Sequence, residues 1–192
     1  MTVLNVAMFG SDELAKSIAK ATDQRDVHTY VHKEYQDEVA KIISIIRPAR
    51  YPERLRPLLN AISAGRVGII EVNSVDATLG EVLVAFASSS INLGLVVINP
   101  PNDEWIDEEM VKKMLAQAGL SKWKFIANDG VEIRNALYQL MEEIEQELVD
   151  SAASQLVVSI DQYFNVKGIG LVAIGYVPVS YTHLTLPTML PV

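Results

Sequence analysis

The chain of 192 residues has no cysteine and only three histidines, His28, His32 and His183. Without thiols, disulfides, thiolate metal sites and a cysteine nucleophile are all excluded. A histidine-rich metal site is disfavoured as well, because His28 and His32 would face each other only on a helix. Their surroundings, "VHTYVH", alternate in polarity and predict a strand. We expect structural or surface roles for these histidines.

Long apolar runs are also missing, and basic residues are few. No run approaches the roughly 18 to 20 apolar residues that a membrane-spanning helix needs, and "MTVLNVAMFG" lacks the basic region of a signal peptide. The net charge of −8 and the pI of about 4.9 disfavour general nucleic-acid binding. We expect a cytoplasmic protein with no membrane or DNA partner, although a local basic patch remains compatible with this charge.

Short apolar runs alternate with segments of helical period over residues 1–148. The runs at 3–9, 27–32, 40–48, 66–73, 93–99 and 122–128 predict strands, and the segments at 11–22, 51–63, 79–91, 107–119 and 130–148 predict helices. This order predicts an α/β fold, a mostly parallel sheet with helices on both faces. Ligands of such sheets bind beyond the carboxyl ends of the strands, and Gly10 lies at the end of the first strand.

The pattern changes after Leu148. We predict a linker at 149–154, and residues 155–178 read as strand, turn and strand, with Gly168 and Gly170 at the bend. No helix follows. These residues are expected to be the first strands of a separate β domain that is cut short.

The last residues have an unusual pattern. "VSYTHLTLPT", residues 179–188, closely resembles one reading frame of a transposase-end adapter used in sequencing libraries. We interpret 179–192 as a non-native tail and assign it no function. The alternative is a natural third strand, because "SYTHLTL" alternates in polarity.

"GSDELAKS", Gly10 to Ser17, has the spacing of a phosphate-binding P-loop, G-x-x-x-x-G-K-[ST], with Ala15 in place of the second glycine. In such a loop, backbone N–H groups and a helix N-terminus surround the phosphates, the lysine reaches the outer phosphates and the hydroxyl holds magnesium. Lys16 and Ser17 match these two roles. A Cβ at Ala15 would crowd the close approach of phosphate.

The same stretch also matches an ordinary helix start. Ser11 is a typical N-cap, and Asp12 and Glu13 stand where acidic side chains stabilise the positive end of a helix. Lys16 is then a solvated helix lysine. The residues alone leave both interpretations open.

"VSIDQYFNVKGIGLVAIGYV", residues 158–177, resembles the opening of domain two in translational GTPases of the elongation factor Tu and initiation factor 2 type. The matching residues are Ile160, Asp161, Phe164, Lys167, Gly168 and Gly170. The order of elements in "GRVGIIEVNSVDATLGEVLVAFASSSINLGLVVIN" is similar to that of the family's G domain. The resemblance covers nearly all of residues 1–178 and is nearest to archaeal elongation-factor-like proteins with degenerate nucleotide motifs. It implies a P-loop-GTPase-like domain at 1–148 and the start of a β-barrel in which Phe164 fills the interior.

The resemblance implies GTP and magnesium as cofactors, bound by Gly10, Lys16, Ser17 and Asn99, with Ser17 on the metal if the magnesium nucleotide binds. Other motifs depart from the family. "IRPARYP" stands where Asp-x-x-Gly is expected, with Arg47 in place of the aspartate, and "NPPN" replaces Asn-Lys-x-Asp. Hydrolysis needs metal, charge neutralisation and a positioned water together. We therefore assign no catalytic residue and expect no appreciable GTP hydrolysis.

The sequence favours an elongation factor-like protein that acts by binding the ribosome, tRNA or another translation factor. One alternative is an active GTP-binding elongation factor. Another is a flavodoxin-like or receiver-like module unrelated to translation, since Asp12 and Glu13 lie at a strand end, but Arg47 stands where its lone aspartate is expected.

A small basic patch lies within "RYPERLRP", at Arg50, Arg54 and Arg56. Two interpretations are open for it, an RNA contact and an ordinary surface turn before a helix. The net negative charge of the chain favours the second.

Overall fold

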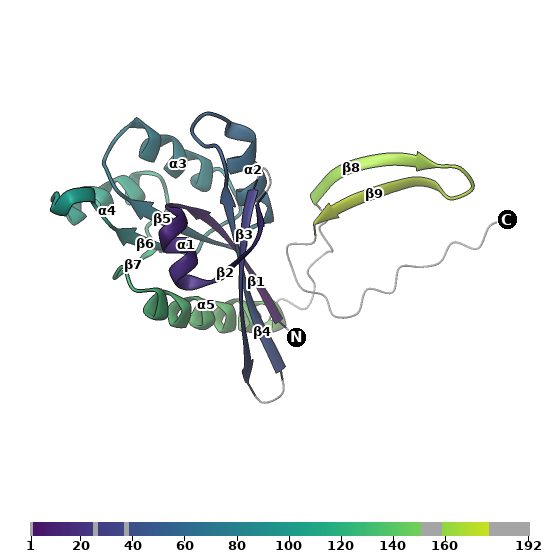
Figure 1. Ribbon diagram of the computed structural model, residues 1–192, viewed down its shortest axis with the longest axis horizontal. Helices are drawn as coiled ribbons and strands as arrows, with labels where there is room; N and C mark the ends of the chain where they lie inside the picture. The colour runs from purple at the N-terminus through teal and green to yellow at the C-terminus, as the bar shows by residue number, and fades with distance from the viewer. Residues whose placement is uncertain (1, 25–26, 37–38, 151–158, 177–192) are drawn as a thin grey trace.

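The structure, a computed structural model, describes residues 2–24, 27–36, 39–150 and 159–176 (Figure 1). The predicted tail at 179–192 and residues 151–154 of the predicted linker lie outside the described residues, so both assignments stay predictions. In the described part of the chain, no helix combines the length and the apolar character needed to cross a membrane.

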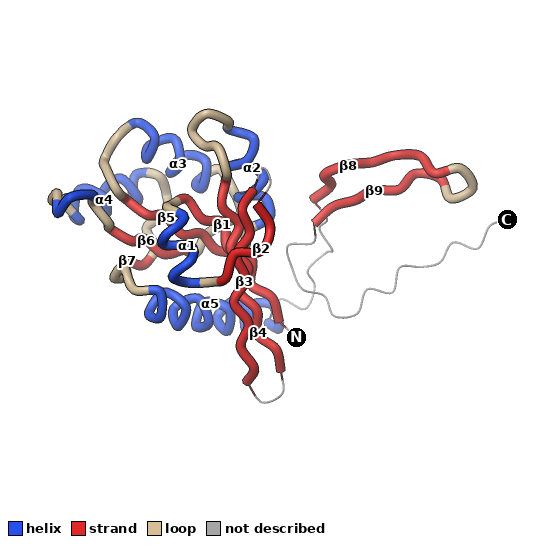
Figure 2. Tube along the Cα trace, viewed as in Figure 1, coloured by secondary structure: helices blue, strands red, loops and turns tan. Residues whose placement is uncertain are grey.

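Up to Asp150, the described residues form one seven-stranded sheet with helices packed on it (Figure 2). The strands are β1 (Thr2–Phe9), β2 (Lys20–Gln24), β3 (Val27–Gln36), β4 (Val39–Pro48), β5 (Val67–Val72), β6 (Gly94–Ile98) and β7 (Lys124–Ile126). The helices are α1 (Asp12–Ile18), α2 (Leu55–Ala64), α3 (Ala77–Ala87), α4 (Glu108–Gln117) and α5 (Gly130–Asp150), with a 3₁₀ turn η1 at Pro101–Asp103.

The strand order is β2-β3-β4-β1-β5-β6-β7. The five strands from β4 to β7 in this order are parallel, whereas β3 is antiparallel to both of its neighbours. The prediction of an α/β fold with a mostly parallel sheet is confirmed. β1 lies between β4 and β5, so the turn that follows Phe9 is flanked by the carboxyl ends of both strands.

Helices cover both faces of the sheet, as predicted, with α1 and α5 on one face and α2, α3 and α4 on the other (Figure 1). The first core contains the helix side chains Leu14, Ala15, Ile18, Ile133, Leu137, Leu140, Met141 and Ile144. The second contains Leu58, Ile62, Leu79, Val82, Leu83, Phe86, Val111 and Leu115. Consecutive residues of β1 enter different cores, Val6 the first and Ala7 the second. A strand that is covered on both faces is therefore expected to be apolar at nearly every position.

The predicted helix at 11–22 is wrong beyond Ile18. Ala19 is extended, and Lys20 pairs with Val31 as β2 joins the edge of the sheet. The guanidinium of Arg134 in α5 donates to the carbonyl oxygens of Ser17 and Ile18, both at 2.9 Å, and so satisfies two acceptors at the end of α1. These tertiary contacts outweigh the helical propensity of the residues that follow.

α5 continues through residues 149 and 150, which the sequence placed in the linker. Described by itself, the second sheet is an antiparallel hairpin of β8 (Ser159–Val166) and β9 (Gly170–Tyr176). Gly168 and Gly170 have φ of 88° and 97°, which confirms glycine at the predicted bend. Phe164 is 43% exposed in this hairpin, since two strands alone cannot enclose a barrel interior.

Candidate functional site

The turn from β1 to α1 lies at the carboxyl edge of the sheet, where ligands of α/β proteins bind. Ser11 caps α1, its hydroxyl accepting the Leu14 N–H at 3.1 Å, with Asp12 and Glu13 in the first turn. The predicted N-cap and acidic first turn are confirmed. Only Gly10 and Ser11 separate the strand from the helix, so residues that would form the loop of a phosphate cradle are helical.

A buried carboxylate lies against this turn. Glu71 in β5 is 1% exposed and is the one buried charged side chain in the described part of the chain. Oε2 accepts a hydrogen bond from the Ser11 N–H, and Oε1 accepts one from Nδ2 of Asn99 at 2.6 Å. A backbone donor of this turn, of the kind that a P-loop directs at phosphate, therefore donates to a carboxyl group of the protein itself.

Gly10 is tightly enclosed. A Cβ at this position would lie 2.9 Å from both Cβ and Oε2 of Glu71, so only glycine lets the two strand ends approach this closely. Arg47 at the end of β4 donates through Nε to the Gly10 carbonyl oxygen at 2.6 Å, and its Nη1 lies 3.4 Å from Nδ1 of His28. Arg47, which stands where the sequence resemblance predicts an aspartate, thus holds the turn from the other side.

Lys16 and Ser17 are engaged within α1 and with the neighbouring sheet. Nζ of Lys16 lies 2.5 Å from Oδ2 of Asp12, whose Oδ1 accepts the Tyr30 hydroxyl. The Ser17 hydroxyl donates to the Leu14 carbonyl oxygen at 2.8 Å. The hydroxyl that matches P-loop chemistry is bonded within the helix, and the ammonium, on a side chain that is 56% exposed, is paired with a carboxylate of the same helix.

The structure thus brings two of the four predicted site residues, Gly10 and Asn99, together around Glu71, whereas Lys16 and Ser17 make separate contacts. Ala15, at the position of the missing glycine, is fully buried in the core. The described residues therefore do not fit a magnesium nucleotide.

Hydrogen bonding and burial set the protonation states of Asp12 and Tyr30. The hydrogen bond from Lys16, and then the one from Tyr30, hold the pKa of Asp12 below its usual value. Burial, and then the bond to Asp12, raise the pKa of Tyr30 to about 12. Tyr30 therefore stays a neutral donor and Asp12 an ionised acceptor at neutral pH.

The ion pair should make stability depend on pH in acid. The lowered folded pKa of Asp12 means that its contribution is present above the unfolded value, near 3.8, and is lost as the pH falls through the folded pKa. At pH 7 we expect D12N to melt about 2 °C below the wild type, a small margin because the pair is partly exposed. The margin should close below pH 3.8 in thermal melts followed by circular dichroism. E13Q, in the same turn, is the charge-matched control, and an equal margin at every pH would contradict the role given to the pair.

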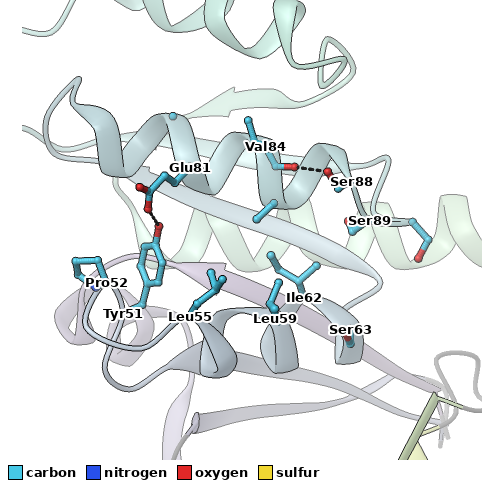
Figure 3. A pocket seen from close by; sticks show the side chains of 13 residues that line it. Tyr51, Pro52, Leu55, Leu59, Ile62, Ser63, Glu81, Val84, Ser88 and Ser89 are labelled. Carbon is cyan, nitrogen blue, oxygen red and sulfur yellow. Dashed lines mark hydrogen bonds between the residues drawn. The ribbon is translucent and has the colours of Figure 1, made fainter.

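The protein has a hollow at the turn from β1 to α1 and a groove between α2 and α3. The first, of about 280 Å³, is lined on its polar side by Ser11, Glu71, Asn73, Ser74, Asp76 and Thr78. No basic side chain belongs to its lining, so it offers nothing to neutralise phosphate. The second is a groove of about 1040 Å³ between α2 and α3, with Leu55, Leu59 and Val84 along its walls and the Tyr51–Glu81 hydrogen bond of 3.0 Å at one end (Figure 3).

Comparisons with known proteins give one relative and one fold. No family model matches the chain. An uncharacterized protein of Methanocaldococcus jannaschii is 28% identical over 178 residues, which are 92% of this chain and 53% of the relative, so the chain spans about half of that protein's length. The crystal structure of the bacterial selenocysteine-specific elongation factor EF-Sec matches with a TM-score of 0.53 at 17% identity, over 91% of this chain and 34% of that one. The chain therefore has the fold of part of a translation elongation factor.

Sequence reasoning missed Glu71. Its signal is a single acid inside the apolar run "VGIIEV", in a strand that is buried at all six positions. A charge in a fully buried strand must find hydrogen-bond partners, and the strand ends on either side supply them.

Proposed function

We propose that the chain is part of a translation elongation factor-like protein that acts by binding the ribosome, tRNA or another translation factor and does not hydrolyse GTP. The observation that carries the proposal is the Glu71 carboxylate on the amide of Ser11, within a fold similar to that of an elongation factor. A nucleotide-dependent switch needs backbone N–H groups of this loop for phosphate. Here the Ser11 N–H donates to the protein itself.

The loss of hydrolysis follows from the partners of the other groups. Phosphoryl transfer depends on cations placed around the transferred group. Lys16 is paired with Asp12, and Arg47 donates through Nε to a backbone carbonyl. The nearby hollow presents Glu71 and Asp76, whose carboxylates would repel phosphate.

Sedimentation with ribosomes tests the binding part of the proposal and whether a nucleotide takes part in that binding. We expect the chain to pellet with ribosomes to the same extent with and without magnesium GTP, and K16A to pellet like the wild type, because the nucleotide plays no part. An unrelated protein of similar net charge should remain in the supernatant.

Two outcomes would count against the proposal. Pelleting no better than that of the charge-matched protein would remove the ribosome as the binding partner. Pelleting that requires GTP and is lost in K16A would instead establish a working nucleotide site.

A further inference from the structure

Positive charge is concentrated in one short segment of this acidic chain. Of the 16 lysines and arginines, four are arginines within residues 47–56, where Glu53 is the single acid, although the whole chain carries a net charge of −8. Arg47 is used inside the candidate site, through its bond to Gly10. Arg50, Arg54 and Arg56 remain and are called the arginine patch below.

The arginine patch is presented to solvent by a tight turn. All three side chains are exposed, and the Arg54 N–H donates to the Arg50 carbonyl oxygen at 2.7 Å, which places one arginine before the turn and two at its end. Among the described residues none of the three forms an ion pair with a carboxylate. By contrast, Lys41 and Lys112 are both paired.

The patch coincides with the start of α2. Arg54 is its N-cap residue and makes no side-chain capping bond, and the first turn of this ten-residue helix contains no acid. A positive helix end beside three guanidinium groups adds to the local attraction for anions. Asp76 and Asp107, in contrast, cap α3 and α4 with carboxylates.

We propose that the arginine patch binds the phosphate backbone of an RNA strand, a proposal that rests on the proposed function. Guanidinium groups bind phosphate oxygens in a bidentate manner, and the patch contains arginine and no lysine. The acidic remainder of the surface repels a polyanion, so it directs RNA to this face. The segment that the family resemblance assigns to nucleotide sensing is here a polyanion contact.

Binding of a fluorescently labelled short RNA hairpin, measured by anisotropy between about 50 and 200 mM KCl, tests the proposal. We expect R54Q/R56Q to bind roughly tenfold more weakly than the wild type, and the slope of log K against log salt to become shallower by about 1.4 to 1.8. K113Q/K122Q removes the same charge from two other exposed lysines and should bind within roughly twofold of the wild type, since it leaves the phosphate contacts in place. Matching circular dichroism melts establish that both variants are folded.

Equal binding by R54Q/R56Q and K113Q/K122Q, or no binding of the hairpin by the wild type, would overturn the assignment. A poly-glutamate peptide that binds as tightly as RNA, and is equally weakened by R54Q/R56Q, would show an acidic protein partner instead. If R54Q/R56Q still pellets with ribosomes while the hairpin fails to bind, the assignment of RNA binding to the arginine patch is wrong and the proposed function stands. If the wild type itself does not pellet with ribosomes, ribosome binding is wrong as the proposed function.

Discussion

Replacing Gly94 with alanine should lower the free energy of unfolding by about 3 kcal/mol. Gly94 in β6 pairs with Gly68 in β5, and the indole ring of Trp123 lies over both. A Cβ at Gly94 would lie 2.5, 2.6 and 2.7 Å from Cδ2, Cε3 and Cε2 of Trp123. The ring is 5% exposed and packs edge-on against Phe86, with centroids 5.1 Å apart, so it has no free space to move into.

A double-mutant cycle separates this clash from other effects of the added methyl group. W123L replaces the indole ring with a smaller side chain, so G94A/W123L should be more stable than the sum of the single changes predicts by more than about 1 kcal/mol. Urea unfolding followed by far-UV circular dichroism measures all four proteins, since the fluorescence of Trp123 is lost in two of them. Simple additivity would show that the ring is not what excludes the methyl group.

Gly80 provides the matched control for a glycine-to-alanine change. It lies inside α3, and a Cβ there would meet no atom within 4 Å. G80A should therefore raise the free energy of unfolding by about 0.5 to 1 kcal/mol, because alanine is the better helix former. If the free energy of unfolding falls in G94A and rises in G80A, the loss in G94A comes from steric crowding and not from a general effect of replacing glycine with alanine.

The fold was largely predictable because its strands are buried on both sides. Continuous apolar runs such as "VGIIEV" and "GLVVI" can be read without knowing their neighbours. β2 was not predictable in this way: residues 20–22 continue a helical pattern, and only pairing with β3 and the Arg134 contacts make them a strand. Non-local pairing of this kind leaves little trace in the local sequence.

The candidate site was predictable in part. The Ser11 cap follows from local chemistry, because its partner lies three residues away. The contact between Ser11 and Glu71 joins residues 60 positions apart, and it depends on β1 and β5 being neighbours in the sheet. The parallel order places Gly10, Glu71 and Asn99 at one edge, and a sequence without known strand order cannot predict which acid reaches which amide.

Removing the Glu71 carboxylate should have a comparably large effect. In E71A the Ser11 N–H and the Asn99 amide lose their acceptor in a part-buried place, and an unsatisfied donor that is buried costs about 1 to 3 kcal/mol. We expect the free energy of unfolding to fall by about 3 kcal/mol in urea titrations at pH 7. E71Q keeps the shape and one acceptor, and rotation of the Asn99 amide restores the second bond, so its loss should be about 1 kcal/mol or less.

The E71A variant also tests whether Glu71 alone prevents nucleotide binding at the loop between β1 and α1. If Glu71 alone kept phosphate away, E71A would gain saturable, magnesium-dependent binding of fluorescent GTP. We expect no such gain, because Lys16 stays paired with Asp12, Ala15 stays buried in the core, and the helix still begins at residue 12. D12N/E71A, which also weakens the lysine pair, is the more demanding test. GTP binding by the double variant and not by E71A would show that the carboxylates of Asp12 and Glu71 together prevent nucleotide binding. GTP binding by E71A itself would show that the loop can still bind phosphate once the Glu71 side chain is removed.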